Sequence, residues 1–381
     1  MSELSLCVVA GEPSGDLQGS LLIAAIRRRH PEWQLWGVGG DRMAAAGCDL
    51  WQNARDWAVM GFVEVLRSLP KFRRRLLDLQ GEITRRRPDG VILIDFPGFN
   101  LKLAERLHAA AVPALYYIVP QIWAWGQKRI EVFRHCIGRT IVVFPFERDF
   151  FAARGVTVDW VGHPLVDSVR VSVPRPALRE RLGVAAEEKL VAMLPGSRVQ
   201  DFHYHLPLFT EAVKLLGESV TGIRWALGLA PSLAEHAEEL RRRVGAAPVT
   251  TAIYDLVAAA DLVLTKTGTA TVECALLGTP MVCAYRTGAL NFAIARRLVK
   301  VRYIAMPNLI AGRRIVPELV QYAATPEALS AEAEALLADP AAAERQREGL
   351  AEVRALLGHP GAVERAVDVI EDWLRVKAPP A

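Results

Sequence analysis

The sequence predicts an α/β protein with two doubly wound domains, each a parallel sheet that carries helices on both faces. Short apolar segments of strand length alternate with helical segments through the first half of the chain, and the alternation restarts near residue 189. Segment 90–95 (GVILID) is apolar almost throughout, which is typical of a parallel strand buried on both faces. The length of 381 residues suits two Rossmann-like domains.

The first half contains a regular series of strands and helices. We expect strands at 5–10, 35–38, 90–95, 114–118 and 140–144, and helices at 17–29, 42–46 and between residues 61 and 87. Ser14 and Asp16 are residue types that cap helices, so we expect them to begin the first helix. The turns that follow the strands are the candidate ligand sites, because ligands bind beyond the carboxyl ends of parallel strands.

The second half repeats this organisation. We expect strands at 189–194, 223–229, 262–264 and 281–284, and helices at 206–216, 233–244 and 269–277. Segment 164–176 combines prolines with a change in composition, which indicates a join between domains. We therefore expect an N-terminal domain at 1–168, a second domain at 169–350, and a helix within 351–381 that packs back on the first domain.

Composition excludes several classes of protein. The five cysteines are widely spaced and form no CxxC pair, so neither a disulfide framework nor a zinc site is indicated, which fits a reducing cytosol. The N-terminus lacks the basic and apolar regions of a signal peptide, and the most apolar window, 109–125, is interrupted by prolines. The net charge of +4 suits phosphates or anionic lipid surfaces and does not require nucleic acid, which we do not expect as a partner.

The turn after strand 189–194 is a candidate anion-binding site. The strand stops at Pro195 and Gly196 and is followed by Ser197 and Arg198. A glycine turn that leads into a helix directs unpaired backbone N–H groups at one point, and an arginine fork suits a phosphate. The alternative is a tight turn with a surface arginine, and these residues alone do not decide between the two.

A second turn of this kind follows strand 262–264. Segment 265–273 (TKTGTATVE) supplies Gly268 and Thr269 at a helix start, with Glu273 within the first turns of the helix. Glu273 could accept two ribose hydroxyls, or it could simply favour the positive end of the helix. Together the two turns predict a diphosphate and ribose site in one domain.

Two turns of the first half carry carboxylates. Asp95 follows the most apolar strand, where a charged group is costly unless it is used or paired, so we favour a general base over a helix cap. Glu12 and Ser14 lie in GEPSGD, whose spacing matches neither dinucleotide nor P-loop patterns. The alternative for that turn is helix capping, although Glu12 suggests hydrogen bonds to a polyhydroxylated ligand.

Other polar and aromatic residues are more ambiguous. His163 lies near the expected join, where a structural role is commoner, although near a phosphate it could donate a proton or hydrogen bond. Trp123 and Trp125 are two residues apart and would face the same way in an extended segment. Core packing is the commoner explanation for such tryptophans.

Taken together, these motifs resemble the lipid-A-disaccharide synthase family. The motifs are AGEPSGD, VMGFVEVL, IDFPGFN, QIWAW, VGHPLVD, LPGSR, GTATVE and PNLIAGRRIVPELVQ, in that order between Val8 and Gln321. The resemblance implies an inverting glycosyltransferase of the GT-B type, with two Rossmann-like domains facing a cleft. It implies transfer of diacylglucosamine from UDP-2,3-diacylglucosamine to 2,3-diacylglucosamine 1-phosphate, which gives a β-1,6-linked disaccharide and UDP without a metal or other cofactor.

The resemblance also implies roles for individual residues. Asp95 is expected to be the base, and Arg198 is expected to take the charge of the departing diphosphate. Donor-side residues would be Gly196, Ser197, Gly268, Thr269, Glu273, Asn308 and Gln321, and acceptor-side residues would be Glu12, Ser14 and Met60, beside Asp95. Asp201 and Lys266 differ from the family pattern that we expect, and Lys266 adds a cation beside the diphosphate.

Acylated substrates imply a peripheral enzyme at the cytoplasmic face of the inner membrane. Segment 62–77 mixes apolar and basic residues, as an anionic interface requires, with candidate contacts at Phe62, Val65, Leu66, Leu69, Phe72, Arg73 and Arg74. An ordinary surface helix is the alternative, and a second basic cluster at Arg296, Arg297, Lys300 and Arg302 is equally ambiguous. A homodimer is left open.

Two other functions fit the same residues. One is another GT-B enzyme that acts on UDP-GlcNAc, such as an epimerase or a lipid-carrier transferase. The other is a non-catalytic protein that binds a UDP-sugar and associates with a membrane. Turnover of unacylated UDP-GlcNAc would favour the first, and UDP binding without product would favour the second.

Overall fold

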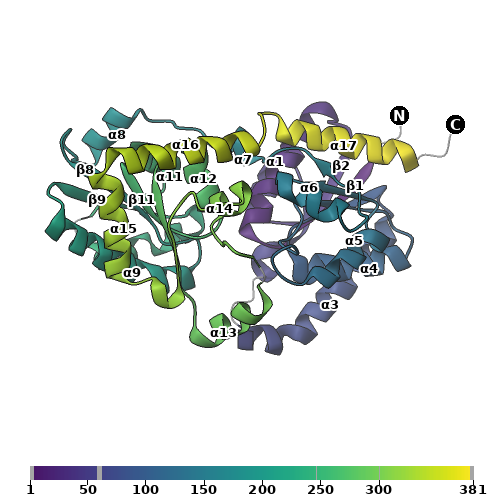
Figure 1. The fold of residues 1–381 in the computed structure, drawn as a ribbon. Coiled ribbons are helices and arrows are strands. Elements are labelled where there is room, and N and C mark those ends of the chain that lie inside the picture. Colours follow the sequence, from purple (N-terminus) through teal and green to yellow (C-terminus); the bar gives the residue numbers. More distant parts are fainter. Residues whose placement is uncertain (1–3, 58–61, 246, 300, 378–381) are drawn as a thin grey trace. The chain divides into compact units, whose positions relative to one another are not determined.

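The computed structural model describes residues 4–57, 62–245, 247–299 and 301–377 and divides into two compact units (Figure 1). The first unit comprises Met1–Asp167 and Gly358–Ala381, and the second comprises Ser168–Leu357. The second division falls later than the expected residue 350 because helix α16 (Pro340–Leu356) runs unbroken within the second unit. In the described part of the chain, no helix combines the length and apolar character needed to cross a membrane.

The first unit is built on a seven-stranded sheet of order β3-β2-β1-β4-β5-β6-β7, whose neighbouring strands pair in parallel. Six of these strands follow the 3-2-1-4-5-6 order of a Rossmann sheet, and β7 extends it. The strands are β1 (Ser5–Ala10), β2 (Gln34–Gly39), β3 (Asp49–Asn53), β4 (Gly90–Ile94), β5 (Ala114–Tyr117), β6 (Arg139–Val142) and β7 (Asp159–Trp160).

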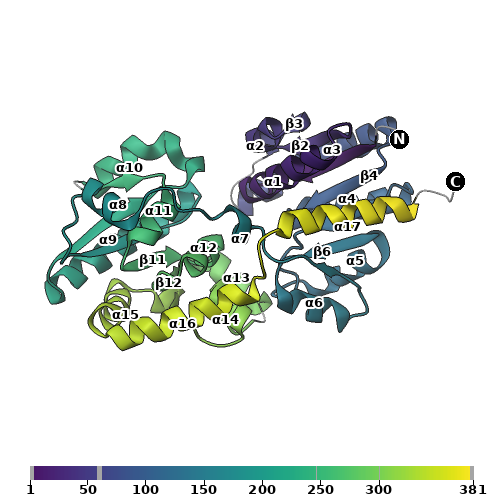
Figure 2. The ribbon, with the colours of Figure 1, turned by 90° about the horizontal axis from the view of Figure 1, so that it is seen from above.

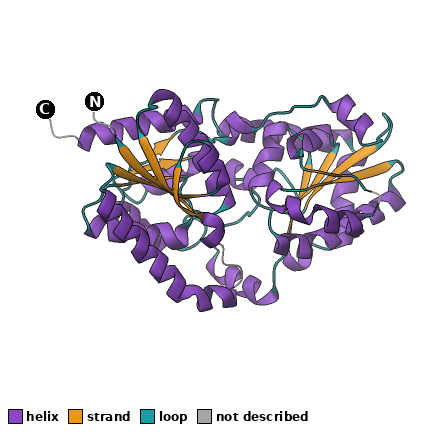
Figure 3. Ribbon diagram, turned by 180° about the vertical axis from the view of Figure 1, so that it is seen from behind, coloured by secondary structure: helices purple, strands orange, loops and turns teal. Residues whose placement is uncertain are grey.

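Helices cover both faces of this sheet because successive strand residues point to opposite sides. Cys7 and Val9 of β1 pack in one core layer with α3, α4, α5 and α6, whereas Leu6 and Val8 pack in the other with α1, α2 and α17. Figure 3 shows the strands as orange arrows between purple helices. The helices are α1 (Pro13–Arg29), α2 (Asp41–Ala45), α3 (Phe62–Arg86), α4 (Pro97–Ala109), α5 (Ile130–Cys136), α6 (Pro145–Ala152) and α17 (Ala362–Lys377), with short 3-10 helices η1 (Ala54–Trp57) and η2 (Gln127–Arg129).

The C-terminal helix α17 belongs to the first unit and packs against α1 (Figure 2). Its Trp373 lies against Gly90, where a side chain would place a Cβ only 2.4 Å from the indole ring. Asp167 holds the start of the helix, because its carboxylate accepts the backbone N–H groups of Gly361 at 2.6 Å and Ala362 at 2.9 Å. An ion pair of 2.6 Å between Arg29 and Asp368 joins the two helices further along.

The second unit repeats the same topology with a six-stranded sheet of order β10-β9-β8-β11-β12-β13, again paired in parallel. The fold class predicted from the sequence is therefore confirmed. The strands are β8 (Lys189–Leu194), β9 (Ile223–Gly228), β10 (Val249–Thr250), β11 (Leu262–Lys266), β12 (Met281–Tyr285) and β13 (Glu318–Val320).

Helices of the second unit bury the apolar faces of this sheet. Val191 and Met193 of β8 share a core layer with α9, α10 and α15. Helix α11 contacts β8 and β9, and helix α12 contacts β11 and β12. Helix α9 starts well before the expected residue 206 and contains Pro207 within it. The helices are α8 (Arg175–Arg181), α9 (Val199–Ser219), α10 (Ala237–Val244), α11 (Ile253–Ala259), α12 (Thr269–Leu277), α13 (Ala289–Leu298), α14 (Met306–Ala311), α15 (Pro326–Ala338) and α16, with α7 (Leu165–Ser168) at the division between units and 3-10 helices η3 (Pro231–His236) and η4 (Gln321–Ala323).

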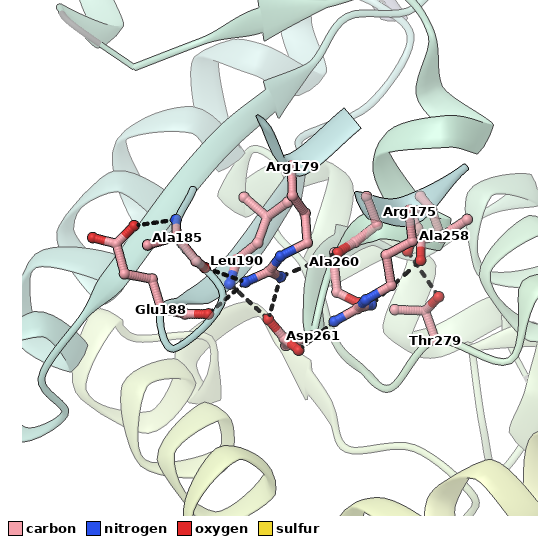
Figure 4. A network of polar contacts seen from close by, with 11 residues as sticks. Arg175, Arg179, Ala185, Glu188, Leu190, Ala258, Ala260, Asp261 and Thr279 are labelled. Carbon is pink, nitrogen blue, oxygen red and sulfur yellow. Dashed lines mark hydrogen bonds and ion pairs between the residues drawn. The ribbon is translucent and has the colours of Figure 1, made fainter. Parts of the chain in front are cut away.

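A polar network fixes the amino-terminal edge of this sheet (Figure 4). The carboxylate of Asp261 accepts the N–H of Leu190 at 2.8 Å and pairs with Arg179 at 2.9 Å and Arg175 at 2.6 Å. Burial alone would raise the pKa of Asp261, but the Leu190 N–H and the two guanidinium groups together lower it. The network ties α8 to the starts of β8 and β11, at the ends of the strands opposite the candidate ligand turns.

Candidate functional site

Within each unit, two of the turns singled out from the sequence are neighbours at the point where the strand order of the sheet reverses. In the first unit, Ala10 at the end of β1 pairs with Ile94 at the end of β4, so the turns beginning at Gly11 and Asp95 are neighbours. In the second unit, Leu194 of β8 pairs with Thr265 of β11. These reversal points are where open parallel sheets bind ligands.

The backbone at Asp95 has an unusual conformation that its neighbours hold. Asp95 and Phe96 have positive φ values of 43° and 49°, which non-glycine residues adopt only where the surroundings impose them. The carbonyl oxygen of Asp95 accepts hydrogen bonds from the Tyr116 hydroxyl at 2.5 Å and the Asn100 amide at 2.9 Å. Burial raises the pKa of Tyr116, and the charge of Asp95 raises it further, so the phenol remains a donor.

The turn after β1 contacts the Asp95 turn. A Cβ at Gly11 would lie 2.3 Å from the ring of Phe96, so only glycine allows this approach. Glu12 precedes α1 without capping it through its side chain, and Ser14 is exposed. The expectation that Ser14 and Asp16 cap this helix is wrong. Pro13 begins the helix, and the buried carboxylate of Asp16 instead accepts the N–H groups of Gly40 at 2.7 Å and Met43 at 3.0 Å, at the start of α2.

Sequence reasoning missed a buried carboxylate in the first unit, Glu147. It is 1% exposed and accepts hydrogen bonds from the Trp123 indole at 3.2 Å and the Phe144 N–H at 3.0 Å. Burial raises the pKa of Glu147 to about 7, and the negative charge of Asp95 contributes to the rise. Its position three residues after Phe144, where capping-box glutamates occur, was the available signal.

The two tryptophans of the QIWAW segment have different environments. Trp123 is 7% exposed, whereas Trp125 is 38% exposed and lies under the guanidinium of Arg129, 4.3 Å from its ring centre. Residues 121–125 form turns, so the extended segment in which the two rings would face the same way does not occur here.

His163 holds a turn near the end of the first unit. Its Nδ1 accepts the N–H of Leu165 at 3.1 Å, and its ring contacts that of Phe144. Burial lowers the pKa of His163 to about 3, so the imidazole is neutral at physiological pH. This favours the structural role over proton donation.

Two helix starts of the second unit border its reversal point. Gly196 has a φ of 132°, and Ser197 and Arg198 are exposed immediately before α9, with Arg198 at its N-cap. Gly268, with a φ of 151°, precedes Thr269 at the start of α12. Backbone N–H groups and the positive ends of two helices therefore occur on neighbouring turns, an arrangement that favours anions.

Glu273 lies on α12, four residues after its start. Its Oε1 accepts a hydrogen bond from the Tyr254 hydroxyl of α11 at 3.1 Å. Burial raises the pKa of Glu273 despite this hydrogen bond.

Asn308 and Gln321 use their amides within the protein. Asn308 is fully buried, and its amide donates to Val316 O at 2.9 Å and Glu318 Oε2 at 3.1 Å. Its Oδ1 accepts the N–H groups of Ile315 and Val316. The Gln321 amide pairs with both the N–H and the carbonyl of Thr287, at 3.1 and 2.9 Å. Both side chains therefore hold loops of the second unit, a role that motif reasoning did not foresee.

The structure brings together three residues near the start of α9 that the sequence motifs did not group: Asp201, His205 and Lys266. The buried ring of His205 donates from Nδ1 to Asp201 O at 2.8 Å and accepts the Arg286 N–H at Nε2, at 3.0 Å. Burial lowers the pKa of His205. Lys266 pairs with the Asp201 carboxylate at 2.9 Å. The i,i+4 spacing of Asp201 and His205 was the only local signal.

Several expected site residues lie outside the part of the chain that the structure describes. They are Met60, expected on the acceptor side, and the side chains of the expected membrane contacts Phe62, Val65, Leu66 and Leu69. Phe72 is partly buried, and its ring packs edge-on against Phe99 at the border of the core, with 5.3 Å between ring centres. Arg73 and Arg74 are exposed.

Solved structures share this fold. A calicheamicin glycosyltransferase, CalG4, matches with a TM-score of 0.63 at 17% identity, covering all of both chains. A UDP co-structure of MnaA from S. aureus matches with a TM-score of 0.66 at 13% identity, covering 100% of this chain and 99% of that one.

Sequence comparison is more specific. The family model for lipid-A-disaccharide synthetase matches residues 6–365. The lipid-A-disaccharide synthase of Myxococcus xanthus is 38% identical over 374 residues, 97% of each chain. That of Pseudomonas paraeruginosa is 43% identical over 343 residues, 88% of this chain and 90% of its own. This chain therefore belongs to the lipid-A-disaccharide synthase family of glycosyltransferases.

Proposed function

We propose that the enzyme transfers a 2,3-diacylglucosaminyl group from its UDP-linked form to the 6-hydroxyl of 2,3-diacylglucosamine 1-phosphate. The products are the β-1,6-linked disaccharide and UDP. The observation that carries this proposal is the family match over residues 6–365, in a chain whose ligand turns lie at the reversal points of both sheets. We assign the nucleotide to the second unit and the acceptor sugar to the first.

In the proposed reaction, Asp95 removes the proton of the acceptor hydroxyl as its oxygen attacks C1 of the donor sugar. The bond between C1 and the diphosphate oxygen breaks, and UDP leaves with the electron pair. One such displacement inverts the anomeric configuration. The fixed backbone of Asp95 supports the assignment, because two hydrogen bonds to its carbonyl restrict where the carboxylate lies. Glu12, Ser14 and Met60 are assigned to the acceptor.

The leaving diphosphate needs compensating positive charge. We assign this to Arg198 and to the N–H groups at Gly196, Ser197, Gly268 and Thr269. Glu273 is assigned to the ribose hydroxyls. Asn308 and Gln321 act on the donor side as positioning residues, because their amides hold the loops at 315–318 and 286–288.

The role of Asp95 is tested by Asp95→Asn, with Asp89→Asn at the opposite end of the same strand as the control. Asp89 accepts the Ser5 N–H at 2.7 Å and is exposed. We expect Asp95→Asn to abolish disaccharide formation while UDP still binds, and Asp89→Asn to retain turnover. Near-normal turnover in Asp95→Asn removes it as the base.

Arg198→Ala tests the charge assignment, and Arg347→Ala on α16 is its control, since Arg347 is exposed and pairs with Glu344 on its own helix. Loss of the guanidinium should lower kcat at least as much as loss of an oxyanion donor, about a hundredfold. An unchanged kcat contradicts the assignment.

Substrate class is tested with acylated and unacylated UDP-glucosamine donors, followed by mass analysis of the product. We expect strong preference for the acylated donor. Epimerisation or transfer of unacylated UDP-GlcNAc at a comparable rate would favour the other GT-B activities.

We also propose that the enzyme binds an anionic membrane surface at the cytoplasmic face of the inner membrane. Helix α13 supports this, because Leu290 is 71% exposed and Ile294, one turn later, is 37% exposed, with exposed Arg296 and Arg297 following. Apolar residues beside arginines suit an anionic interface. Leu290→Ser/Ile294→Ser should reduce sedimentation with phosphatidylglycerol vesicles, whereas Val171→Ser, which removes another exposed apolar residue, should not. Equal sedimentation of both variants contradicts a role for α13.

A further inference from the structure

We infer that Lys266 is a second cation for the diphosphate and that Asp201 orients it. This rests on the proposed function, because it adds a binding residue to the nucleotide site of the second unit. Lys266 connects the two candidate anion-binding turns, because its backbone precedes the turn at Gly268 and its side chain reaches Asp201 beside the other.

The register of the sheet places Lys266 between the two turns. Thr265 of β11 pairs with Leu194, the last residue of β8, and Lys266 pairs with Ala284 of β12. Leu262 and Leu264 pack in the layer that contains α9, so Lys266, at the same strand parity, projects to that side. Its ammonium therefore meets the first turn of α9, 2.9 Å from Asp201 Oδ1.

The Asp201 carboxylate lies against the LPGSR turn and is only partly satisfied. A Cβ at Gly196 would lie 2.4 Å from the Asp201 Cβ, which shows how closely the side chain covers the turn. Asp201 Oδ2 is buried and has no hydrogen-bond partner among the described residues. A buried carboxylate oxygen without a donor is costly, so the Lys266 ion pair is the main compensation for this charge.

Two positive charges act on His205, whose Nδ1 donates to Asp201 O. Burial lowers the pKa of His205, and the charges of Lys266 and Arg286 lower it further. His205, which links Asp201 to Arg286, is neutral in this arrangement, because its Nε2 accepts the Arg286 N–H and so carries no proton. An ammonium has three donors, and the pair with Asp201 uses one. Lys266 can thus keep Asp201 while donating to a phosphate oxygen.

The test measures binding of UDP, UMP and uridine to Lys266→Met by calorimetry. We expect affinity for UDP to fall tenfold to a hundredfold, the loss typical of one hydrogen bond to a charged group, with a smaller loss for UMP and none for uridine. Lys266→Arg should retain most of the UDP affinity. Lys214→Met on the exposed side of α9, where Lys214 pairs with Glu211 of the same helix, is the control and should bind UDP normally.

The double variant Lys266→Met/Asp201→Asn separates direct from indirect action. If Lys266 only neutralises Asp201, removing both charges restores the wild-type affinity for UDP, which overturns the inference. If Lys266 contacts the diphosphate, the double variant stays weak. Equal losses for UDP and uridine also overturn it. Failure of the unaltered protein to bind UDP at all would instead contradict the proposed function.

Discussion

Replacement of Asn308 by alanine should destabilise the second unit without directly removing a ligand contact. Asn308 is fully buried, and its amide makes four hydrogen bonds. Alanine leaves two backbone N–H groups and one carbonyl without partners, whereas Glu318 keeps the N–H groups of Ile304 and Ala305. Each stranded buried group costs about 1–3 kcal/mol, so we expect a loss of about 4 kcal/mol in the free energy of unfolding.

Asn308→Asp sharpens this prediction because aspartate has nearly the same shape. Its Oδ1 could still accept both N–H groups, but its second oxygen would face Glu318 Oε2 and Val316 O, which are both acceptors. We expect it to be at least as destabilising as alanine at neutral pH. Asn291→Ala on the exposed side of α13 is the control and should change stability by less than about 0.5 kcal/mol.

The measurements are calorimetric unfolding and hydrogen exchange at Ile315 and Val316, the two N–H groups that Asn308 holds. Exchange there should accelerate in both variants. Loss of UDP affinity with unchanged stability and unchanged exchange would refute the structural role and would indicate that Asn308 contacts the ligand directly.

Three other predictions concern charge and backbone conformation. Glu147→Gln should become more stable relative to the unaltered enzyme as pH rises from 5 to 8, by up to about 3 kcal/mol. Because the pKa of Glu147 is raised to about 7, its ionisation above the ordinary pKa of a glutamate costs the unaltered enzyme stability. Parallel stability curves for the two proteins would contradict this. Asp261→Asn should lower the free energy of unfolding by about 3 kcal/mol at pH 7, because it leaves the buried Arg179 guanidinium without its carboxylate. The difference should shrink as pH falls below about 4, because a lowered pKa of Asp261 contributes stability only above the ordinary pKa of an aspartate. A pH-independent difference in urea unfolding would contradict this. Gly196→Ala should weaken UDP binding more than tenfold, since the φ of 132° at Gly196 and the 2.4 Å approach of the Asp201 Cβ leave no room for a methyl group. The control, Gly217→Ala within α9, should bind UDP normally and gain about 0.5–1 kcal/mol in the free energy of unfolding. Equal UDP affinity in both variants would show that the turn tolerates a side chain.

The positions of the candidate turns were predictable from the sequence because they depend on local pattern. An apolar run that ends at glycine or at a carboxylate marks a strand end, and parallel pairing brings such ends to one edge. Asp95, Gly196 and Gly268 all follow this rule, and the strand at Lys189–Leu194 and the helix at Thr269–Leu277 have the expected bounds.

What the sequence could not give depends on partners far along the chain. Asp16 caps a helix that begins 25 residues later, at Asp41, and the partly buried Phe72 of α3 packs against Phe99 of α4. A short polar edge strand such as β3 (Asp49–Asn53) carries no apolar pattern. Lys266 and Asp201 stand out in the sequence only as separate departures from the expected family pattern, and the register of β11 beside β8 brings them together.

The return of the chain to its first unit has a consequence for biosynthesis. Val367, Ile370 and Trp373 of α17 complete an apolar layer whose other members, such as Leu22 and Ile23, are translated hundreds of residues earlier. Until the segment that begins at Gly358 is made, that layer lacks its cover. The second unit, by contrast, is one continuous segment of the chain. The first unit thus cannot complete this core layer until its C-terminal helix is made, and a nascent chain stalled before Gly358 would present an uncovered apolar face to chaperones.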